Sequence, residues 1–207
     1  MNASAADIGP VLDALDLLAA SPDPELRTAF DARAPICVAR APGRLDVMGG
    51  FADYSGSLTL ELPTAEAAYV AVQAREAPRV QVLSAGFGAQ QGSLRRAEFP
   101  LAELQRETRD HAGASHYFRR DPAQAWAAYV AGTLAALGIE WGCELRAGLS
   151  ILVVSNVPEG KGVSSSAALE VASLYALAAL HGIELDAKTA ALVCQRVENL
   201  VVGAPCG

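Results

Sequence analysis

The sequence has few cysteines, and their spacing excludes several kinds of site. Among 207 residues there are 4 cysteines. They are scattered, with no C-x-x-C pair: Cys37, Cys143, Cys194 and Cys206. This pattern argues against a metal cluster or a disulfide framework and favours a reducing compartment. The sequence also has no G-x-x-x-x-G-K-[ST] segment, so it contains no P-loop.

An excess of basic charge is missing as well, because the formal net charge is −7. Nucleic-acid backbones need a basic face, whereas ATP needs only local positive groups. The N-terminal stretch contains Asp7, Asp13 and Asp16, which is not typical of a secretory signal. The most apolar segment follows Ser166, contains Glu170 and is too short to cross a bilayer. We therefore expect a cytoplasmic protein without a membrane or nucleic-acid partner.

Hydrophobic periodicity and chain breakers predict a mixture of helices and strands. Helices are predicted over residues 8–20, 126–137, 165–182 and 186–202. Strands are predicted over residues 36–41, 45–48, 58–60, 67–73, 80–83 and 149–154, with 58–60 and 67–73 as a pair. Pro42-Gly43 is expected to break the first strand, Gly138 to end a helix, and residues 86–96 to form a surface loop. This order of elements is typical of an α+β layer fold, and 52% hydrophobic residues predict a substantial core.

The most informative segment follows the strand predicted over residues 149–154. It reads V-P-E-G-K-G-V-S-S-S-A-A from Val157 to Ala168. Unpaired N–H groups and the helix dipole favour negative charge at a helix start, and glycines let a phosphate approach the backbone. The segment is therefore a candidate phosphate cradle. From the pattern alone, an ordinary serine-capped helix is an equally good interpretation.

Four segments resemble the GHMP kinases, the superfamily of galactokinase, homoserine, mevalonate and phosphomevalonate kinases. The serine-rich segment resembles the motif P-x-x-x-G-(L)-(G/S)-S-S-A, with Val163 where leucine is usual. The segment A-P-G-R-L-D-V-M-G-G-F-A-D-Y-S-G, residues 41–56, resembles the galactokinase signature A-P-G-R-V-N-L-I-G-E-H-T-D-Y-N-G. Two more galactokinase-like segments are W-x-x-Y-V-x-G at 126–132 and V-E-N-x-x-V-G-x-P-C-G at 197–207. All four occur in the family's order.

The resemblance implies a fold and a domain division. The fold is that of a GHMP kinase N-terminal domain, which is like domain 2 of ribosomal protein S5: an α+β fold with a mixed, largely antiparallel sheet and helices packed on one face. We expect residues 1–30 to form an N-terminal helical extension and residues 31–207 to form the ATP-binding domain, without the family's C-terminal domain. The family's left-handed β-α-β crossover, an exception to the right-handed rule, is expected at the phosphate loop.

The resemblance also implies transfer of phosphate from Mg-ATP to the anomeric hydroxyl of a monosaccharide. The residues that it assigns to ATP are Pro158, Gly160, Lys161, Gly162, Val163, Ser164, Ser165, Ser166 and Ala167. Ser166 and Glu198 align with magnesium ligands, and a hydroxyl with a carboxylate suits this hard cation. Arg44 is expected in the active site, where it lowers a carboxylate's pKa and stabilises transferring charge. From the residues alone, Lys161 and Glu198 are also compatible with solvated side chains, and Arg44 with a surface ion pair.

The residues carried over for the sugar are Gly50, Phe51, Asp53, Tyr54, Cys206 and Gly207. Asp53 aligns with an aspartate that binds sugar hydroxyls, although an aspartate in a turn is common. Galactokinases have Glu-His in place of Gly50-Phe51, and that glutamate contacts the C6 hydroxyl. L-Arabinose lacks this hydroxymethyl group, and the segment resembles that of L-arabinokinases. We therefore expect L-arabinose to be preferred over D-galactose, and Gly50→Glu to shift the preference toward galactose.

The family pattern continues after P-C-G with I-M-D-Q, so its catalytic aspartate falls three positions beyond Gly207. We expect this chain alone to have little or no kinase activity. We also expect self-association through the surface that the second domain would cover. The alternative function is a non-catalytic sugar- or nucleotide-binding module derived from a galactokinase-like enzyme. Nucleic-acid binding by a similar β-α-β fold is disfavoured by the acidic charge.

Overall fold

A computed structural model describes residues 8–85 and 94–206, apart from the side chains of Phe51 and Asp53. The strands are β1 (Cys37–Met48), β2 (Leu60–Arg75), β3 (Arg79–Ala85), β4 (Leu94–Pro100) and β5 (Gly148–Ser155). The α-helices are α1 (Gly9–Ala19), α2 (Pro24–Arg27), α3 (Leu101–Glu107), α4 (His111–Arg119), α5 (Ala128–Trp141), α6 (Ser165–Leu180) and α7 (Ala187–Arg196). Shorter turns are the 3₁₀ segments η2 (Gly50–Ser55) and η4 (Ala125–Ala127) and the π-helix η5 (Val197–Val202).

The strands form one mixed sheet in the order β1-β2-β5-β3-β4. β1 with β2, β2 with β5, and β3 with β4 pair antiparallel, while β3 and β5 pair parallel. The central strand β5 is mostly apolar, with Ser150 as its one internal polar residue, and is buried along nearly its whole length, as expected for a strand covered on both faces. The predicted largely antiparallel α+β sheet is confirmed. No strand follows α6 in the described residues, so the left-handed crossover stays a prediction.

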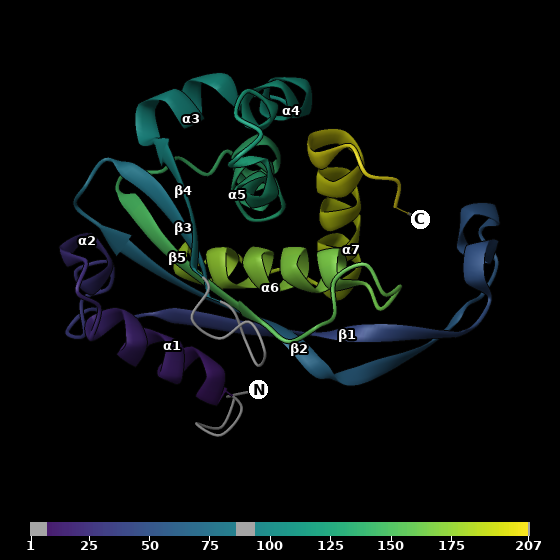
Figure 1. Ribbon diagram of the computed structural model, residues 1–207. Helices are drawn as coiled ribbons and strands as arrows, with labels where there is room; N and C mark the ends of the chain where they lie inside the picture. Colours follow the sequence, from purple (N-terminus) through teal and green to yellow (C-terminus); the bar gives the residue numbers. More distant parts are fainter. Residues whose placement is uncertain (1–7, 86–93, 207) are drawn as a thin grey trace.

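Helices cover the sheet unequally (Figure 1). Helices α3 to α7 pack with the sheet into the larger apolar core, as predicted for one face. On the other face, Val11, Ala14 and Leu18 of α1 pack against residues of β2 and β5, including Tyr69 and Leu152. These three side chains recur at helical spacing, which gives α1 its buried side. The predicted N-terminal helix is thus confirmed and lies directly on the sheet.

Two predicted strand boundaries are wrong. Pro42-Gly43 does not end β1, which continues to Met48 after a register shift between Pro42 and Arg44. A β-bulge absorbs the irregular residues at this point, so pairing with β2 resumes. The runs at 58–60 and 67–73 do not pair with each other, because both the end of the first run and the whole of the second belong to the single long strand β2.

Two further predictions, a helix end at Gly138 and a loop over residues 86–96, differ from the structure, where longer-range packing and pairing outweigh the local sequence signals. Gly138 lies inside α5, which ends instead at Gly142, a residue with φ +63° that suits a left-handed helix end. Of the loop predicted over residues 86–96, Leu94 to Arg96 belong to β4, and 86–93 lie outside the described residues. The short helices α3 and α4 were not predicted. The predicted cap of α7 is confirmed, because the Asp186 carboxylate accepts hydrogen bonds from the backbone N–H groups of Lys188 and Thr189.

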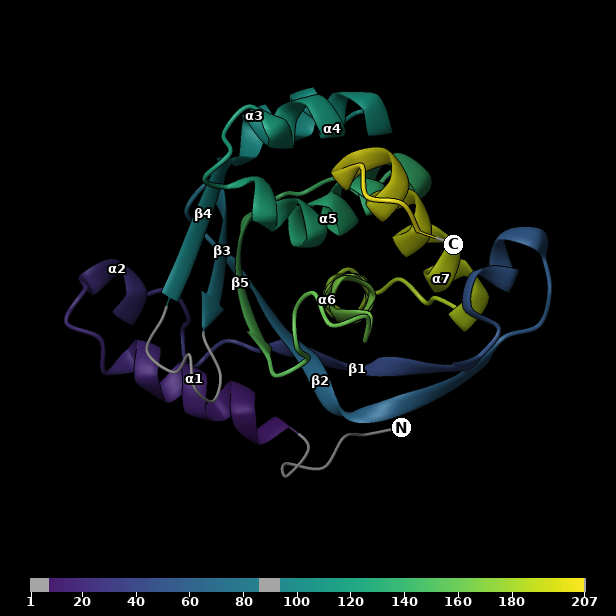
Figure 2. The ribbon, with the colours of Figure 1, turned by 45° about the vertical axis from the view of Figure 1, so that its right-hand side comes forward.

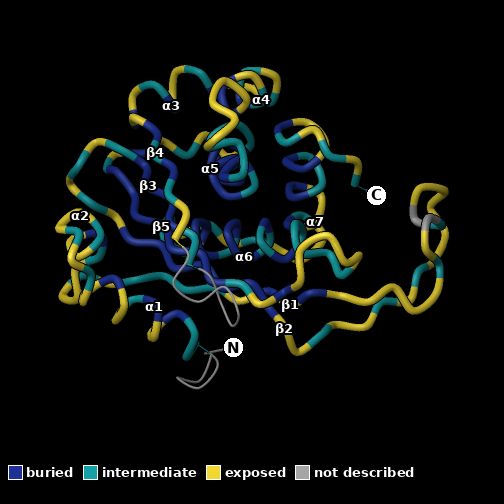
Figure 3. The backbone as a smooth tube through the Cα atoms, viewed as in Figure 1, coloured by how far each residue is buried: buried dark blue, intermediate teal, exposed yellow. Residues whose placement is uncertain are grey.

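Beyond the rest of the sheet, the ends of β1 and β2 project as a hairpin arm, residues 44–63, with η2 at its tip. The arm and the C-terminal segment project on the same side of the molecule (Figures 1 and 2). Most of the arm is exposed, in contrast to the buried centre of the sheet (Figure 3). Its exposed apolar side chains are Leu45, Val47, Met48, Leu58, Leu60 and Leu62. Among the described helices, none has the length and apolar character needed to cross a membrane.

Candidate active site

The serine-rich loop between β5 and α6 has a backbone suited to an anion. Positive φ values occur at every second residue: +67° at Gly160, +72° at Gly162 and +57° at Ser164. Alternating backbone handedness turns successive N–H groups toward one concave side, which is an anion-binding arrangement. Ser164 precedes α6 in the left-handed conformation and makes no side-chain cap, so the serine-capped interpretation is wrong. The first turn of α6 therefore presents unpaired N–H groups at the positive end of the helix dipole.

The hairpin arm is joined to this loop at Arg44. The backbone N–H of Arg44 donates to the Val163 carbonyl (3.1 Å), and its Nε donates to Ser164 Oγ (2.9 Å). Its other guanidinium end pairs with Glu61 of β2. A Cβ at Gly43 would lie 2.9 Å from Val157 Cγ1 and 3.0 Å from the Val163 carbonyl oxygen, so only glycine allows this close approach. The surface ion pair that was the alternative for Arg44 is present, whereas its expected role in an active site stays a prediction.

A pocket of about 290 Å³ opens beside the start of α6. Its lining residues are Ser84, Arg95, Trp126, Tyr129, Val153, Ser155, Glu159, Ser165, Ser166 and Leu169. The Arg95 guanidinium lies over the Trp126 ring, 4.5 Å from its centre. The pocket thus combines an aromatic surface, several hydroxyls and one cation next to the serine-rich loop.

Two buried carboxylates lie behind the loop. Glu170, one turn after Ser166 in α6, is 1% exposed, and Glu198 in η5 is 7% exposed. Neither carboxylate oxygen of Glu170 has a hydrogen-bond partner within the described chain. Burial, and then the nearby Glu198 charge, raise the pKa of Glu170 to about 9. The Glu198 charge acts on Glu170 of α6, and because Glu198 is itself buried, its interpretation as a solvated carboxylate is wrong.

The C-terminal segment is held against Glu198. The Asn199 side chain forms two hydrogen bonds with the Cys206 backbone: Oδ1 accepts from the N–H (2.8 Å), and Nδ2 donates to the carbonyl (3.0 Å). Burial raises the pKa of the Cys206 thiol to about 11, and the charge of Glu198 and a hydrogen bond with it contribute to the rise. The predicted sugar residue Cys206 is thereby fixed next to the predicted metal ligand Glu198. Gly207 lies outside the described residues.

Comparison with known families matches two parts of the chain. The GHMP kinases N-terminal domain matches residues 128–207, and the galactokinase galactose-binding signature matches residues 25–74. The chain carries a GHMP kinase N-terminal domain. The two matches separate along the structure: the first covers α5, β5, α6, α7 and the serine-rich loop of this GHMP kinase domain, and the second covers β1, the hairpin arm and most of β2.

Curated relatives of the GHMP kinase domain include an L-arabinokinase of Arabidopsis thaliana, 46% identical over 201 residues, with 86% of this chain and 19% of that protein covered. A galactokinase of Chloroflexus aurantiacus is 33% identical over 173 residues, with 84% of this chain and 39% of that protein covered. The chain thus spans about a fifth of the first relative's length and about two fifths of the second's.

Solved structures share the fold. The galactokinase of Lactococcus lactis, complexed with galactose, matches with a TM-score of 0.70 at 22% identity. The match includes 95% of this chain and 44% of the galactokinase chain. A mevalonate kinase matches with a TM-score of 0.61 at 14% identity, and the match includes 81% of this chain and 48% of the mevalonate kinase chain. These likenesses confirm the predicted GHMP kinase fold.

The residues near the loop of the GHMP kinase domain fit a magnesium ion that arrives with a nucleotide. The Ser166 hydroxyl and the Glu198 carboxylate are hard oxygen ligands of the kind that Mg²⁺ prefers. Within residues 8–85 and 94–206, no group of three or more His, Cys, Asp or Glu side chains could hold a metal ion. The rest of the coordination shell would therefore come from phosphate oxygens and water. A bound Mg²⁺ would neutralise phosphate charge.

Four of the predicted sugar residues, Gly50, Phe51, Asp53 and Tyr54, sit at the tip of the arm. Gly50 begins η2 with φ +48°, and the Tyr54 side chain is exposed. The predicted roles of Phe51 and Asp53 fall on side chains that the structure does not describe. Trp126, Tyr129 and Arg95 were not predicted as site residues. The W-x-x-Y motif was a usable signal for the first two, whereas Arg95 lies in the unpredicted strand β4.

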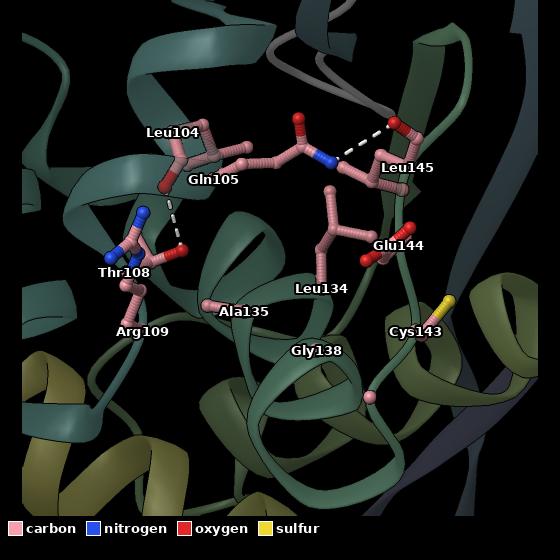
Figure 4. A pocket seen from close by; sticks show the side chains of 11 residues that line it. Leu104, Gln105, Thr108, Arg109, Leu134, Ala135, Gly138, Cys143, Glu144 and Leu145 are labelled. Atoms are coloured by element: carbon pink, nitrogen blue, oxygen red, sulfur yellow. Dashed lines mark hydrogen bonds between the residues drawn. The ribbon is translucent and has the colours of Figure 1, made fainter.

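A larger pocket, of about 660 Å³, lies elsewhere in the domain (Figure 4). Its lining comes from α3, α5 and the segments that follow them: Leu104, Gln105, Thr108, Arg109, Leu134, Ala135, Gly138, Gly142, Cys143, Glu144 and Leu145. It contains none of the residues predicted for ATP, sugar or metal. We therefore place the candidate site at the serine-rich loop, where the predicted residues come together, and not at this larger pocket.

Proposed function

We propose that this chain is the part of an ATP-dependent sugar kinase that holds Mg-ATP and one side of the sugar. One observation carries the proposal: Arg44 of the hairpin arm bonds directly to Ser164 of the serine-rich loop. The element matched by the galactose-binding signature and the element suited to phosphate therefore meet at a single arginine. Phosphoryl transfer depends chiefly on positioning and charge stabilisation, which this junction supplies.

In the proposed reaction, the N–H groups of residues 160–166 and the start of α6 hold the phosphates of ATP. The pocket with Trp126 holds the nucleoside, because an aromatic face and hydroxyls suit a base and ribose. Arg44 lies between phosphate and sugar, where its charge stabilises the transferring group. Lys161 stays a proposed phosphate contact; it is exposed in the loop.

The finer proposals concern the substrate and the isolated chain. We propose L-arabinose before D-galactose as the acceptor; the Arabidopsis thaliana relative, named L-arabinokinase, supports this order. We also propose that the 207-residue chain alone transfers phosphate slowly or not at all. It spans about two fifths of the matched galactokinases, and the family's base aspartate would follow Gly207. The cytoplasmic location stays a prediction from the sequence.

Mg-ADP binding tests the proposed function. ADP with Mg²⁺ should raise the melting temperature of the chain, and EDTA should abolish most of the rise, because a ligand that binds only the native state stabilises it. Ser166→Ala should weaken Mg-ADP binding about tenfold, the effect of losing about 1.4 kcal/mol of binding free energy. The control is Ser115→Ala in α4, which should change nothing. The proposal would be contradicted if Mg-ADP stabilised the wild type, Ser166→Ala and Ser115→Ala equally. It would also be contradicted if Mg-ADP did not stabilise the wild type.

A further inference from the structure

Asp46 shares one face of the hairpin arm with Arg44. The two residues are separated by one position in β1, and alternate residues of a strand point to the same side. Glu61 is the cross-strand partner of Asp46, and it pairs with Arg44 on that same face. Because Arg44 reaches Ser164, this face is turned toward the phosphate loop. Asp46 lies on it about 7 Å from Arg44, one two-residue repeat further toward the tip.

The Asp46 carboxylate has no hydrogen bond or ion pair with the described residues, since Arg44 is paired with Glu61 instead. Its Oδ2 lies 3.7 Å from where a Cβ of residue 50 would be, and apart from the adjoining backbone and the neighbouring residues no other described atom lies within 4 Å of that point. Gly50 is exposed and has φ +48°. Among the described side chains, none therefore fills the space over Gly50 beside the carboxylate.

We propose that Asp46 is a specificity-determining residue of the acceptor site, where its carboxylate accepts hydrogen bonds from hydroxyl groups of the sugar. A carboxylate can accept from two neighbouring hydroxyls, and the space over Gly50 gives them access. The galactose-binding signature, matched at 25–74, includes both residues. The proposal rests on the proposed function, since it names a further contact in the same site.

If Asp46 served only to stabilise the fold, its substitution would lower the melting temperature. Asp46 and Glu61 are like charges directly opposite each other on neighbouring strands, an arrangement that destabilises a sheet. Asp46→Asn should therefore leave the melting temperature unchanged or raise it. If the carboxylate serves the sugar, the same substitution should weaken sugar binding. A stability gain combined with a binding loss is the signature of a functional residue.

The test is calorimetric titration of the 207-residue chain, saturated with Mg-ADP, with L-arabinose and with D-galactose. Asp46→Asn should raise the dissociation constant for L-arabinose about tenfold or more, as expected for a hydrogen bond to a charged group, and leave Mg-ADP affinity unchanged. Asp16→Asn, an exposed carboxylate on α1, is the matched control. An unchanged sugar affinity in Asp46→Asn overturns the proposal. So does a wild-type chain that binds Mg-ADP and neither sugar, whereas failure to bind Mg-ADP overturns the proposed function itself.

Substitutions at position 50 provide a second, independent test. The sequence predicted that Gly50→Glu by itself shifts the preference toward galactose. The position of Asp46 revises that expectation: Gly50→Glu alone should not produce a galactose preference, because the new carboxylate would lie beside that of Asp46 on a backbone with φ +48°. The double variant Asp46→Asn/Gly50→Glu should favour D-galactose over L-arabinose relative to the single variant by about tenfold. The control Asp46→Asn/Gly50→Gln has the same backbone strain without the new charge, and it should not shift the preference toward D-galactose. Equal galactose preference in the single and double Glu variants would overturn a role for Asp46.

Discussion

Glu170 is a buried carboxyl whose pKa depends on its surroundings in the candidate site. Its carboxyl is almost fully buried, has no hydrogen-bond partner in the described residues, and faces the charge of Glu198. Isolated buried carboxylates are costly, so the protonated form is favoured. Burial of Tyr129 itself, and then the charge of Glu198, raise the pKa of this tyrosine, whose ring lines the candidate nucleotide pocket. The acidic cluster and the pocket thus share one electrostatic environment.

The raised pKa of Glu170 predicts a pH-dependent stability. Native Glu170 keeps its proton up to a pH of about 9, whereas an unperturbed carboxyl loses it near 4.5. Between these values the native state binds the extra proton, so the free energy of unfolding falls as pH rises, by at most about 1.4 kcal/mol per pH unit. Glu170→Gln should therefore gain stability relative to wild type from pH 5 to pH 9.

Urea unfolding in metal-free buffer across that pH range measures the difference. Glu144→Gln is the control, because Glu144 is exposed and should run parallel to wild type. Parallel profiles for Glu170→Gln and wild type would show that Glu170 is ionised in the native state and would contradict the account.

At the scale of elements, the bulge in β1 decides how the arm meets the phosphate loop. The register shift between Pro42 and Arg44 turns the Arg44 side chain and backbone toward Val163 and Ser164. Gly43 makes this contact possible because it packs against Val157 without a side chain. The bulge at Pro42-Gly43, where a strand end was predicted, is therefore a feature of the candidate site.

Gly43→Ala should loosen this junction. Its Cβ would overlap Val157 Cγ1 and two oxygens near 3 Å, and such overpacking costs about 1–3 kcal/mol of unfolding free energy. Mg-ADP should then stabilise the variant less than wild type, because the phosphate loop loses its support. Gly9→Ala, at a helical position with nothing within 4 Å, should be neutral or slightly stabilising. Equal stability of the two variants would mean that the bulge does not constrain the loop.

Elements with a strong local signal could be predicted from the sequence. The apolar run of β5, the serine-rich start of α6 and the Asp186 cap of α7 all match the structure. Strand length could not be predicted in β1 and β2, since pairing over long distances carries the chain through Pro42-Gly43 and Pro63. The left-handed φ of Ser164, the burial of Glu198 and the closeness of Asp46 to Gly50 depend on tertiary contacts, which no local pattern reports.

For the whole molecule, the exposed hairpin arm predicts self-association. Exposed apolar side chains, Leu45 and Leu62 among them, lie on an element that projects from the body of the fold. Sedimentation velocity should show association that increases with concentration, and Leu60→Ser/Leu62→Ser should reduce it. Leu12→Ser on α1, also an exposed leucine, is the control. A wild-type chain that stays monomeric at all concentrations would contradict this expectation.

The proposed function requires the serine-rich loop to be the phosphate site. The most direct measurement is the change of backbone amide chemical shifts in the ¹⁵N-labelled 21.4 kDa chain on titration with Mg-ADP. We predict the largest changes at the amides of residues 160–167, followed by the Trp126 indole and Arg44. Largest changes around the pocket of Figure 4, at residues such as Thr108 and Glu144, or no changes at residues 160–167, would contradict the account.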